Sequence, residues 1–228
     1  MPKTYRTEII GYKFEELSID AQMNIYGNDE YFSHSVDFDP IERDFRELMI
    51  EHFGAILGTL EVYYDVSYSQ GSGACCVAEL DVDTVFANRV GSYFAKLLGL
   101  INSGRVEIDA INIVRCGPSN FYNHEKTCQV EIEYSCDSNA VGDWEGEDIT
   151  ELEEMLTNAI REELCELHSK LQDHYEESTS FEIYCEVMCE SDSVYTEDGK
   201  VVDPVFIRNA YASDAVQLKL DFDDYEYE

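Results

Sequence analysis

The sequence predicts an α+β fold, in which a mainly antiparallel sheet packs with helices and one long, acidic helix lies in the C-terminal half. Apolar residues alternate with polar ones in four short segments, the period of strands, and recur every three or four positions in five others, the period of helices. The segments do not follow the strict strand–helix–strand order of a parallel sheet. We expect one α+β domain over residues 1–228, in which residues 137–190 are a candidate protruding acidic helical subdomain and residues 221–228 a flexible acidic tail.

Four strands are expected in the sheet. Residues 60–68 are rich in β-branched and aromatic residues, and a break at residues 69–73 precedes a returning strand at residues 74–80. Residues 106–114 and 127–134 form a further hairpin, because the sequence Gly-Pro-Ser-Asn between them is typical of turns. We therefore expect mainly antiparallel pairing.

Five helices are expected where apolar residues show helical spacing: residues 15–26, 40–53, 84–98, 149–175 and 179–189. Pro40 suits a first helical turn, and His52 is expected at the edge of the core, at the end of a stripe that begins with Ile41, Phe45 and Leu48. The longest helix has the most regular stripe: Ile149, Leu152, Leu156, Ile160, Leu164, Leu167 and Leu171. An extended arm and a tight turn are expected at residues 1–12 and 197–200.

The charge of the chain is its strongest signal. Asp and Glu number 49 and Lys and Arg 15, so that the formal net charge is −34 at pH 7; a magnitude of roughly 2–8 is enough to keep a small domain soluble. Because like charges repel one another, they destabilise the compact chain. Three explanations stay open: a high-salt environment, a partner with a basic surface, or acidity without a function.

The acidic residues are concentrated in the expected long helix and around it. Residues 137–190 contain 17 acidic and 2 basic residues. Carboxylates four residues apart on a helix are separated by about 6 Å along its axis, comparable with neighbouring phosphates along one nucleic-acid strand. Such a helix can present a row of negative charge to a protein groove lined by Lys and Arg, while it repels nucleic acid itself.

The eight cysteines are expected to be reduced, buried thiols. The N-terminus lacks the basic and then apolar run of a signal peptide, and no apolar run of about 18 residues is present, so we expect a cytoplasmic protein with reduced thiols. No Cys-x-x-Cys pair occurs. Cys185 and Cys189 are four apart, but His168 and His174 are six apart and do not match them. No metal or cofactor is expected.

Five short motifs occur in order along the chain: Tyr-x-Phe-x-Glu-Leu-Ser at residues 12–18, a Ser-Gln-Gly-Asp-Gly-Ala-type turn at residues 69–74, Tyr-x-His-Glu at residues 122–125, and two later stretches at residues 171–180 and 196–200. Together they resemble a family of small proteins found mainly in the genomes of tailed bacteriophages and prophages. The resemblance covers most of the chain, and it implies a phage accessory protein and a fold rather than a reaction; some members carry antitoxin labels. Ser72 stands where the family usually has Asp.

The motif residues form a second candidate site: Ser69, Gln70, Gly71, Ser72, Gly73, Tyr122 and His124. Gly71, Ser72 and Gly73 can cradle a phosphate through backbone N–H groups, but they lack the pattern of a phosphate-binding loop. The alternative is a hairpin turn in which both glycines supply positive φ angles. His124 and Glu125 can act as an acid–base pair only in a loop, because adjacent residues of a strand point to opposite faces.

These observations favour a non-enzymatic, phage-encoded acidic inhibitor, a DNA mimic of the anti-restriction or anti-CRISPR type. Its expected partner is a basic, nucleic-acid-binding host protein, and neither nucleic acid nor a membrane is bound directly. The predicted partner-binding residues are acids of the long helix and its N-terminal approach: Asp143, Glu145, Glu147, Asp148, Glu151, Glu154, Glu162, Glu163 and Glu166.

Two alternatives remain. The first is an antitoxin-like regulatory module with an apolar contact, and the second is a small ligand-binding or enzymatic domain that uses the turn at residues 69–74 and His124. The sequence does not determine the oligomeric state, and a dimer is among the states that it allows.

Overall fold

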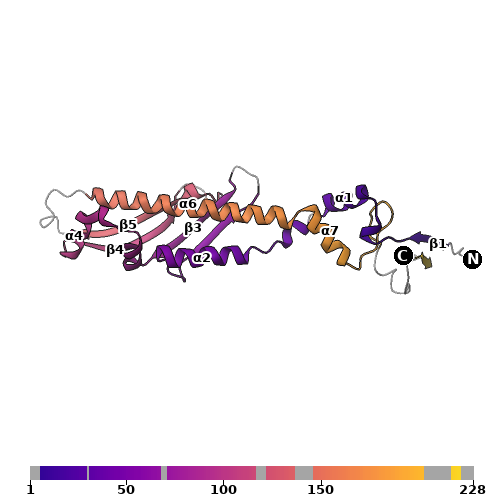
Figure 1. The fold of residues 1–228 in the computed structure, drawn as a ribbon, viewed down its shortest axis with the longest axis horizontal. Helices are drawn as coiled ribbons and strands as arrows, with labels where there is room; N and C mark the ends of the chain where they lie inside the picture. The colour runs from indigo at the N-terminus through magenta and orange to yellow at the C-terminus, as the bar shows by residue number, and fades with distance from the viewer. Residues whose placement is uncertain are drawn as a thin grey trace, which may run out of the picture. The chain divides into compact units, whose positions relative to one another are not determined.

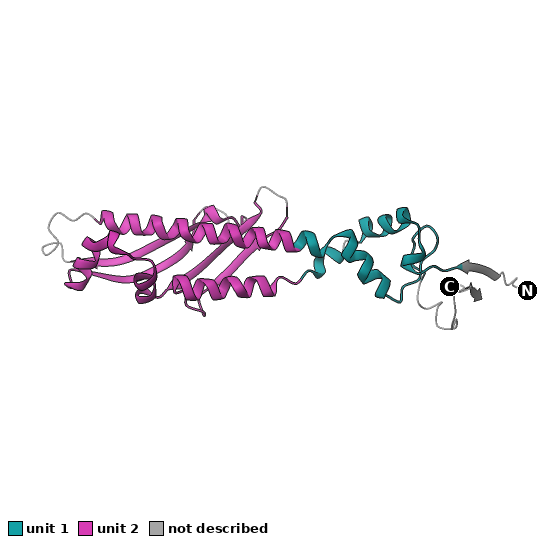
Figure 2. Ribbon diagram, in the orientation of Figure 1, with its two compact units in different colours: residues 1–36, 175–228 teal, residues 37–174 magenta. Residues whose placement is uncertain are grey.

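The computed structural model describes residues 6–29, 31–67, 71–116, 122–136, 146–202 and 217–221. The chain divides into two compact units, of which unit 1 contains residues 1–36 and 175–228 and unit 2 contains residues 37–174 (Figure 2). These boundaries differ from the expected subdomain at residues 137–190, because most of the long helix in that segment packs within unit 2. The expectation that residues 1–228 form one domain stays a prediction.

Unit 2 is built on a four-stranded antiparallel sheet in the order β2-β3-β4-β5. The strands are β2 (Glu61–Asp65), β3 (Gly73–Leu80), β4 (Val106–Arg115) and β5 (Cys128–Cys136). In the centre, Ala78, Ile113 and Val130 lie opposite one another in successive strands, and all three are buried. The predicted α+β class and the antiparallel pairing of the four expected strands are confirmed.

Two helices lie along the sheet, α2 (Asp39–Phe53) and α6 (Glu147–Ser178) (Figure 1). In α2, Phe45, Met49 and Phe53 are spaced four apart and belong to the same buried core as the sheet. His52 is exposed, so its expected place at the edge of the core is wrong: the buried positions of α2 turn this residue outward. In α6 the predicted stripe is confirmed, since its members are at most 2% exposed: Ile149, Leu152, Leu156, Ile160, Leu164, Leu167 and Leu171.

α6 also covers the free edge of β5. Three of its side chains, spaced four apart, bond the strand's backbone: Glu153 Oε1 accepts from Ile132 N at 2.8 Å, Thr157 Oγ1 accepts from Val130 N at 2.9 Å, and Arg161 Nε donates to Cys128 O at 3.0 Å. Four residues of a helix span about 6 Å and two residues of a strand about 6.6 Å, so the two spacings nearly match. The helix therefore satisfies strand groups that an uncovered edge would leave open to another chain.

The helix expected at residues 84–98 is two helices, α3 (Val82–Asn88) and α4 (Ala95–Asn102), with a short 3₁₀ turn, η3 (Ser92–Phe94), before α4. Val85 and Val90 are both buried, but five residues of a continuous helix would place them about 140° apart. The break at residues 89–91 lets both side chains reach the core, and Gly91 weakens a helix by about 1 kcal/mol relative to Ala.

Unit 1 contains two helices, α1 (Ile19–Asn28) and α7 (Phe181–Glu190), the end of α6, and the antiparallel pair β1 (Arg6–Ile10) and β6 (Gln217–Asp221). Two short 3₁₀ turns, η1 (Phe14–Glu16) and η2 (Phe32–Ser35), flank α1. Its small core is largely aromatic: Phe14, Leu17, Ala21, Tyr184 and Tyr195.

Several expectations for unit 1 are confirmed and one is shifted. The arm is extended at residues 6–10, and the tight turn at residues 197–200 closes with Gly199 at a φ of 83°. The first helix begins at Ile19 rather than at residue 15, because the Ser18 hydroxyl accepts from Ala21 N at 3.3 Å and caps it there. Of the expected acidic tail, residues 222–228 lie outside the described residues.

Candidate functional site

α6 carries seven of the nine acids predicted to bind a partner; Asp143 and Glu145 lie outside the described residues. Five of the seven are exposed: Glu147, Glu151, Glu154, Glu162 and Glu166. The other two, Asp148 and Glu163, are half-buried. The helix is anchored by its buried stripe, so the backbone positions of these acids are set by the core of unit 2.

These acids do not share one face of α6. Glu154 borders a hollow of about 440 Å³ beside β5, whereas Glu163 and Glu166 border a groove beside α2. Glu151 and Glu162 are about three helical turns apart and therefore lie on the same side of α6. At about 100° per residue, Glu147, Glu151, Glu154 and Glu162 lie along one side of α6, while Glu163 and Glu166 lie toward α2.

The two basic residues of this segment have contacts of their own. Besides its contact with Cys128 O, Arg161 donates to Lys126 O at 3.3 Å. Lys170 Nζ lies 2.7 Å from Glu166 Oε1. This ion pair partly neutralises the charge of Glu166. We therefore expect Glu166 to attract a basic partner less strongly than the other exposed acids of α6.

A further acidic surface lies on the open face of the sheet. Glu79, Asn112 and Glu131 are opposite one another in successive strands, and Glu133 follows two residues along β5. The three glutamates are exposed. The alternation at residues 127–134 predicts a strand, and the same alternation places Glu131 and Glu133 together on the solvent face. These two acids were not among the predicted partner-binding residues.

The two motif segments come together in unit 2. A Cβ atom on Gly71 would lie 2.2 Å from Cδ1 of Tyr122, and one on Gly73 would lie 2.5 Å from the backbone oxygen of Asn123. Neither glycine has a positive φ, so the expectation that they supply positive φ angles is wrong. Their role is close approach: glycine lets the turn touch the segment around Tyr122. Ser69 and Gln70 lie outside the described residues.

Ser72 and His168 of α6 meet at this junction. The Ser72 hydroxyl donates to Asp65 O at 2.6 Å, and Nε2 of His168 lies 3.1 Å from Ser72 Oγ and 3.2 Å from Asp65 O. A histidine that acts as general base must accept the serine proton, but here that proton is directed at the Asp65 carbonyl. The arrangement ties the turn to α6 and to the end of β2.

His124 and Glu125 lie in the connection between β4 and β5, where Glu125 begins a short 3₁₀ turn, η4 (Glu125–Thr127). Nδ1 of His124 is 2.8 Å from Glu125 Oε2, so the two side chains do contact each other in this loop. On the neighbouring turn of α6, burial raises the pKa of the Cys165 thiol, and the charge of Glu125 raises it further. Cys165 is exposed, but its thiol ionises less readily than an ordinary cysteine.

The cysteines are free thiols, but only three are buried: Cys75, Cys76 and Cys128. The expectation of uniformly buried thiols is therefore wrong for the rest, of which Cys185 is half-buried and four are exposed: Cys116, Cys136, Cys165 and Cys189. The hydrogen bond between the thiols of Cys75 and Cys128 raises the pKa of Cys75, and burial raises it further. The Cys75 thiol therefore stays protonated.

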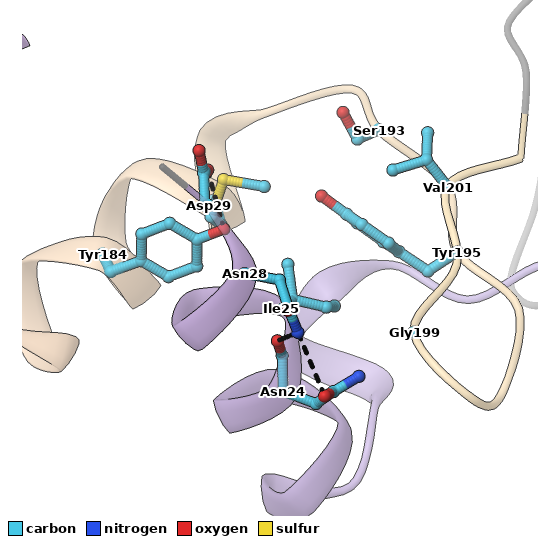
Figure 3. A pocket seen from close by; sticks show the side chains of 10 residues that line it. Asn24, Ile25, Asn28, Asp29, Tyr184, Ser193, Tyr195, Gly199 and Val201 are labelled. Carbon is cyan, nitrogen blue, oxygen red and sulfur yellow. Dashed lines mark hydrogen bonds between the residues drawn. The ribbon is translucent and has the colours of Figure 1, made fainter. Parts of the chain in front are cut away.

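Unit 1 has a hollow of about 430 Å³ between α1 and the segment that follows α7 (Figure 3). Asn24, Asn28, Asp29, Tyr184 and Tyr195 are among the side chains that line it. The Tyr184 hydroxyl donates to Asp29 Oδ2 at 3.1 Å; burial, together with this bond, raises the pKa of Tyr184. The hollow has no basic side chain among its described lining, which disfavours an anionic ligand.

Within the part of the chain that the structure describes, no group of three or more His, Cys, Asp or Glu side chains could hold a metal ion. Nor does any helix there have the length and apolar composition needed to cross a membrane.

Comparison with known proteins identifies the family. Residues 38–180 match the family model described as Domain of unknown function (DUF8835), which covers more than half of the chain and nearly all of unit 2. No curated protein and no solved structure matches the chain. The chain therefore belongs to the DUF8835 family.

Proposed function

We propose that this chain is a non-enzymatic acidic inhibitor, encoded by a phage, that binds the basic nucleic-acid groove of a host protein through α6. One observation carries the proposal. Exposed carboxylates follow α6 from Glu147 through Glu151 and Glu154 to Glu162, while the two bases of the helix are engaged elsewhere. The negative charge of this surface is therefore available to a partner.

The geometry suits a groove that normally holds nucleic acid. With a rise of 1.5 Å per residue, these four carboxylates extend over about 22 Å of helix. Because the helix is already folded, it presents these charges without a cost for ordering its backbone on binding. Affinity of this kind depends on long-range attraction and falls as salt screens the charges.

The phage origin and the cytoplasm of the host as the site of action belong to the same proposal. The motif resemblance supports the phage origin, and a cytoplasmic site of action follows from the proposed partner, a nucleic-acid-binding protein of the host. The acidic surface itself opposes direct binding of DNA or RNA, since both are polyanions.

The test is capture from a bacterial lysate on the immobilised chain at low salt, followed by elution with duplex DNA and, separately, with rising salt. We expect proteins with basic nucleic-acid-binding surfaces to be retained, and both treatments to release them. A captured protein that stays bound during both elutions would contradict mimicry and favour the antitoxin-like alternative, whose contact is apolar.

A further inference from the structure

Unit 2 has an apolar groove between α2 and α6, with a volume of about 140 Å³. Its apolar lining comes from both helices: Ile41, Phe45, Leu48 and Leu167. Phe45 and Leu167 are buried, whereas Ile41 and Leu48 are half-buried and can be reached from outside. An apolar cavity of about 150 Å³ accommodates a benzene molecule, so the groove has room for one aromatic or branched side chain.

The remaining groove residues are charged: Asp44, Glu163, Glu166 and Lys170. The ammonium group of Lys170 is paired with Glu166. Asp44 is 4.0 Å from the Nε of Arg43, and both of these side chains are largely exposed, so that this contact is weak. An apolar slot with carboxylates on both helices favours an apolar side chain flanked by Lys or Arg.

We propose that this groove receives the apolar or aromatic side chain that some nucleic-acid-binding proteins carry between basic residues. Such proteins insert Phe, Leu, Ile or Met between base pairs, next to the Lys and Arg that contact phosphates, or stack aromatic side chains on single-stranded bases. The groove and its carboxylates reproduce that pattern, with the slot in place of an opened base step and the carboxylates in place of phosphates.

This inference rests on the proposed function and narrows the class of partner. The acids of α6 attract any basic surface, and attraction mainly sets the rate of association and the salt dependence. A buried apolar anchor at the centre of an interface provides much of the binding energy. The groove therefore discriminates among basic partners, and those with a wedge or stacking side chain are preferred.

The test uses two fluorescent helical peptides that differ at one position. Both are rich in Lys and Ala; one has Phe at the centre and the other has Ala. Fluorescence anisotropy at low salt measures their binding to the wild-type chain. We expect the Phe peptide to bind at least about tenfold more tightly, because burial of a Phe side chain stabilises a complex by that order.

A pair of protein variants separates the groove from general attraction. Leu48→Glu adds a negative charge while it makes the groove polar, and Ser169→Glu adds the same charge on an exposed position of α6. If attraction alone matters, both variants bind either peptide as well as the wild type or better. If the groove holds the Phe side chain, Leu48→Glu alone abolishes the preference for the Phe peptide. Circular dichroism checks that the Leu48→Glu variant is folded. If it is not folded, the difference in affinity of the two peptides for the wild type still tests the proposal.

The outcomes distinguish a failure of the groove proposal from a failure of the proposed acidic binding surface. Equal binding of both peptides, weakened by salt, overturns the groove and leaves the acidic surface in place. No binding of either peptide at low salt overturns both. If sedimentation shows that the wild type is a dimer and Leu48→Glu a monomer, the groove belongs to a second copy of the chain and the inference is overturned.

Discussion

Substitution of Thr157 tests whether side chains of α6 hold the helix against the edge strand β5. Its Oγ1 accepts from Val130 N at 2.9 Å at a buried position, and Thr157 is 8% exposed. Thr157→Val keeps the size of the side chain and removes this acceptor. A buried N–H group without a partner costs about 1–3 kcal/mol. In a chain of this length, 1 kcal/mol corresponds to roughly 2–4 °C in Tm, so we expect a fall of about 2–12 °C.

Thermal denaturation and hydrogen exchange of the Val130 amide are the assays. Thr157→Ser is the matched control, because it keeps the hydroxyl and loses one methyl group, worth about 0.8 kcal/mol. We expect the Val130 amide to exchange faster in Thr157→Val and to stay protected in Thr157→Ser. Unchanged stability and unchanged exchange in Thr157→Val would refute the idea that α6 side chains seal the edge of β5.

Three further predictions concern single positions. Gly73→Ala lowers Tm, because the new Cβ would lie 2.5 Å from a backbone oxygen, whereas Gly99→Ala, with open space around it, does not; equal Tm values for the two would contradict this. A thiol reagent followed by mass spectrometry labels Cys116, Cys136, Cys165 and Cys189 in the native chain but labels Cys75, Cys76 and Cys128 only after unfolding, and rapid native labelling of the core thiols would disprove it. Hydrogen bonds from the Thr84 hydroxyl and amide lower the pKa of Asp81 below its usual 3.8, so its stabilising effect is complete above pH 3.8 and is lost as pH falls through the lower folded value. The stability gap between wild type and Asp81→Ala should therefore be larger at pH 7 than at pH 2, and a gap independent of pH would count against it.

Much of unit 2 was predictable because its signals are local and regular. The stripe from Ile149 to Leu171 and the alternation in β5 each repeat over several turns or residue pairs, and burial follows these repeats. The helix break at residues 89–91 was missed because individual apolar residues fit a helical period, although Val85 and Val90 together do not. The cap at Ser18 was likewise missed, since Phe14 and Leu17 extend the apolar spacing beyond the helix.

The candidate sites were less predictable because they depend on contacts between distant segments. The sequence identified Gly71 and Tyr122 separately, but their contact is set by the packing of β3 beside the connection between β4 and β5. The pairing of Ser72 with His168 joins residues 96 positions apart. The groove between α2 and α6 likewise combines side chains that no local pattern links.

The central claim is that the outward side of α6, and not the net charge alone, binds the partner. Two variants with equal changes in net charge test it directly: Glu151→Lys, Glu154→Lys and Glu162→Lys together on α6, and Glu79→Lys, Glu131→Lys and Glu133→Lys together on the open sheet face. All six positions are exposed, and exposed substitutions usually change stability by about 0.5 kcal/mol or less. The measurement is the amount of DNA-elutable protein that each variant captures from a bacterial lysate at low salt. We predict that the α6 variant captures almost none while the sheet variant captures as much as the wild type; undiminished capture by the α6 variant, or an equal loss in both, would contradict the claim.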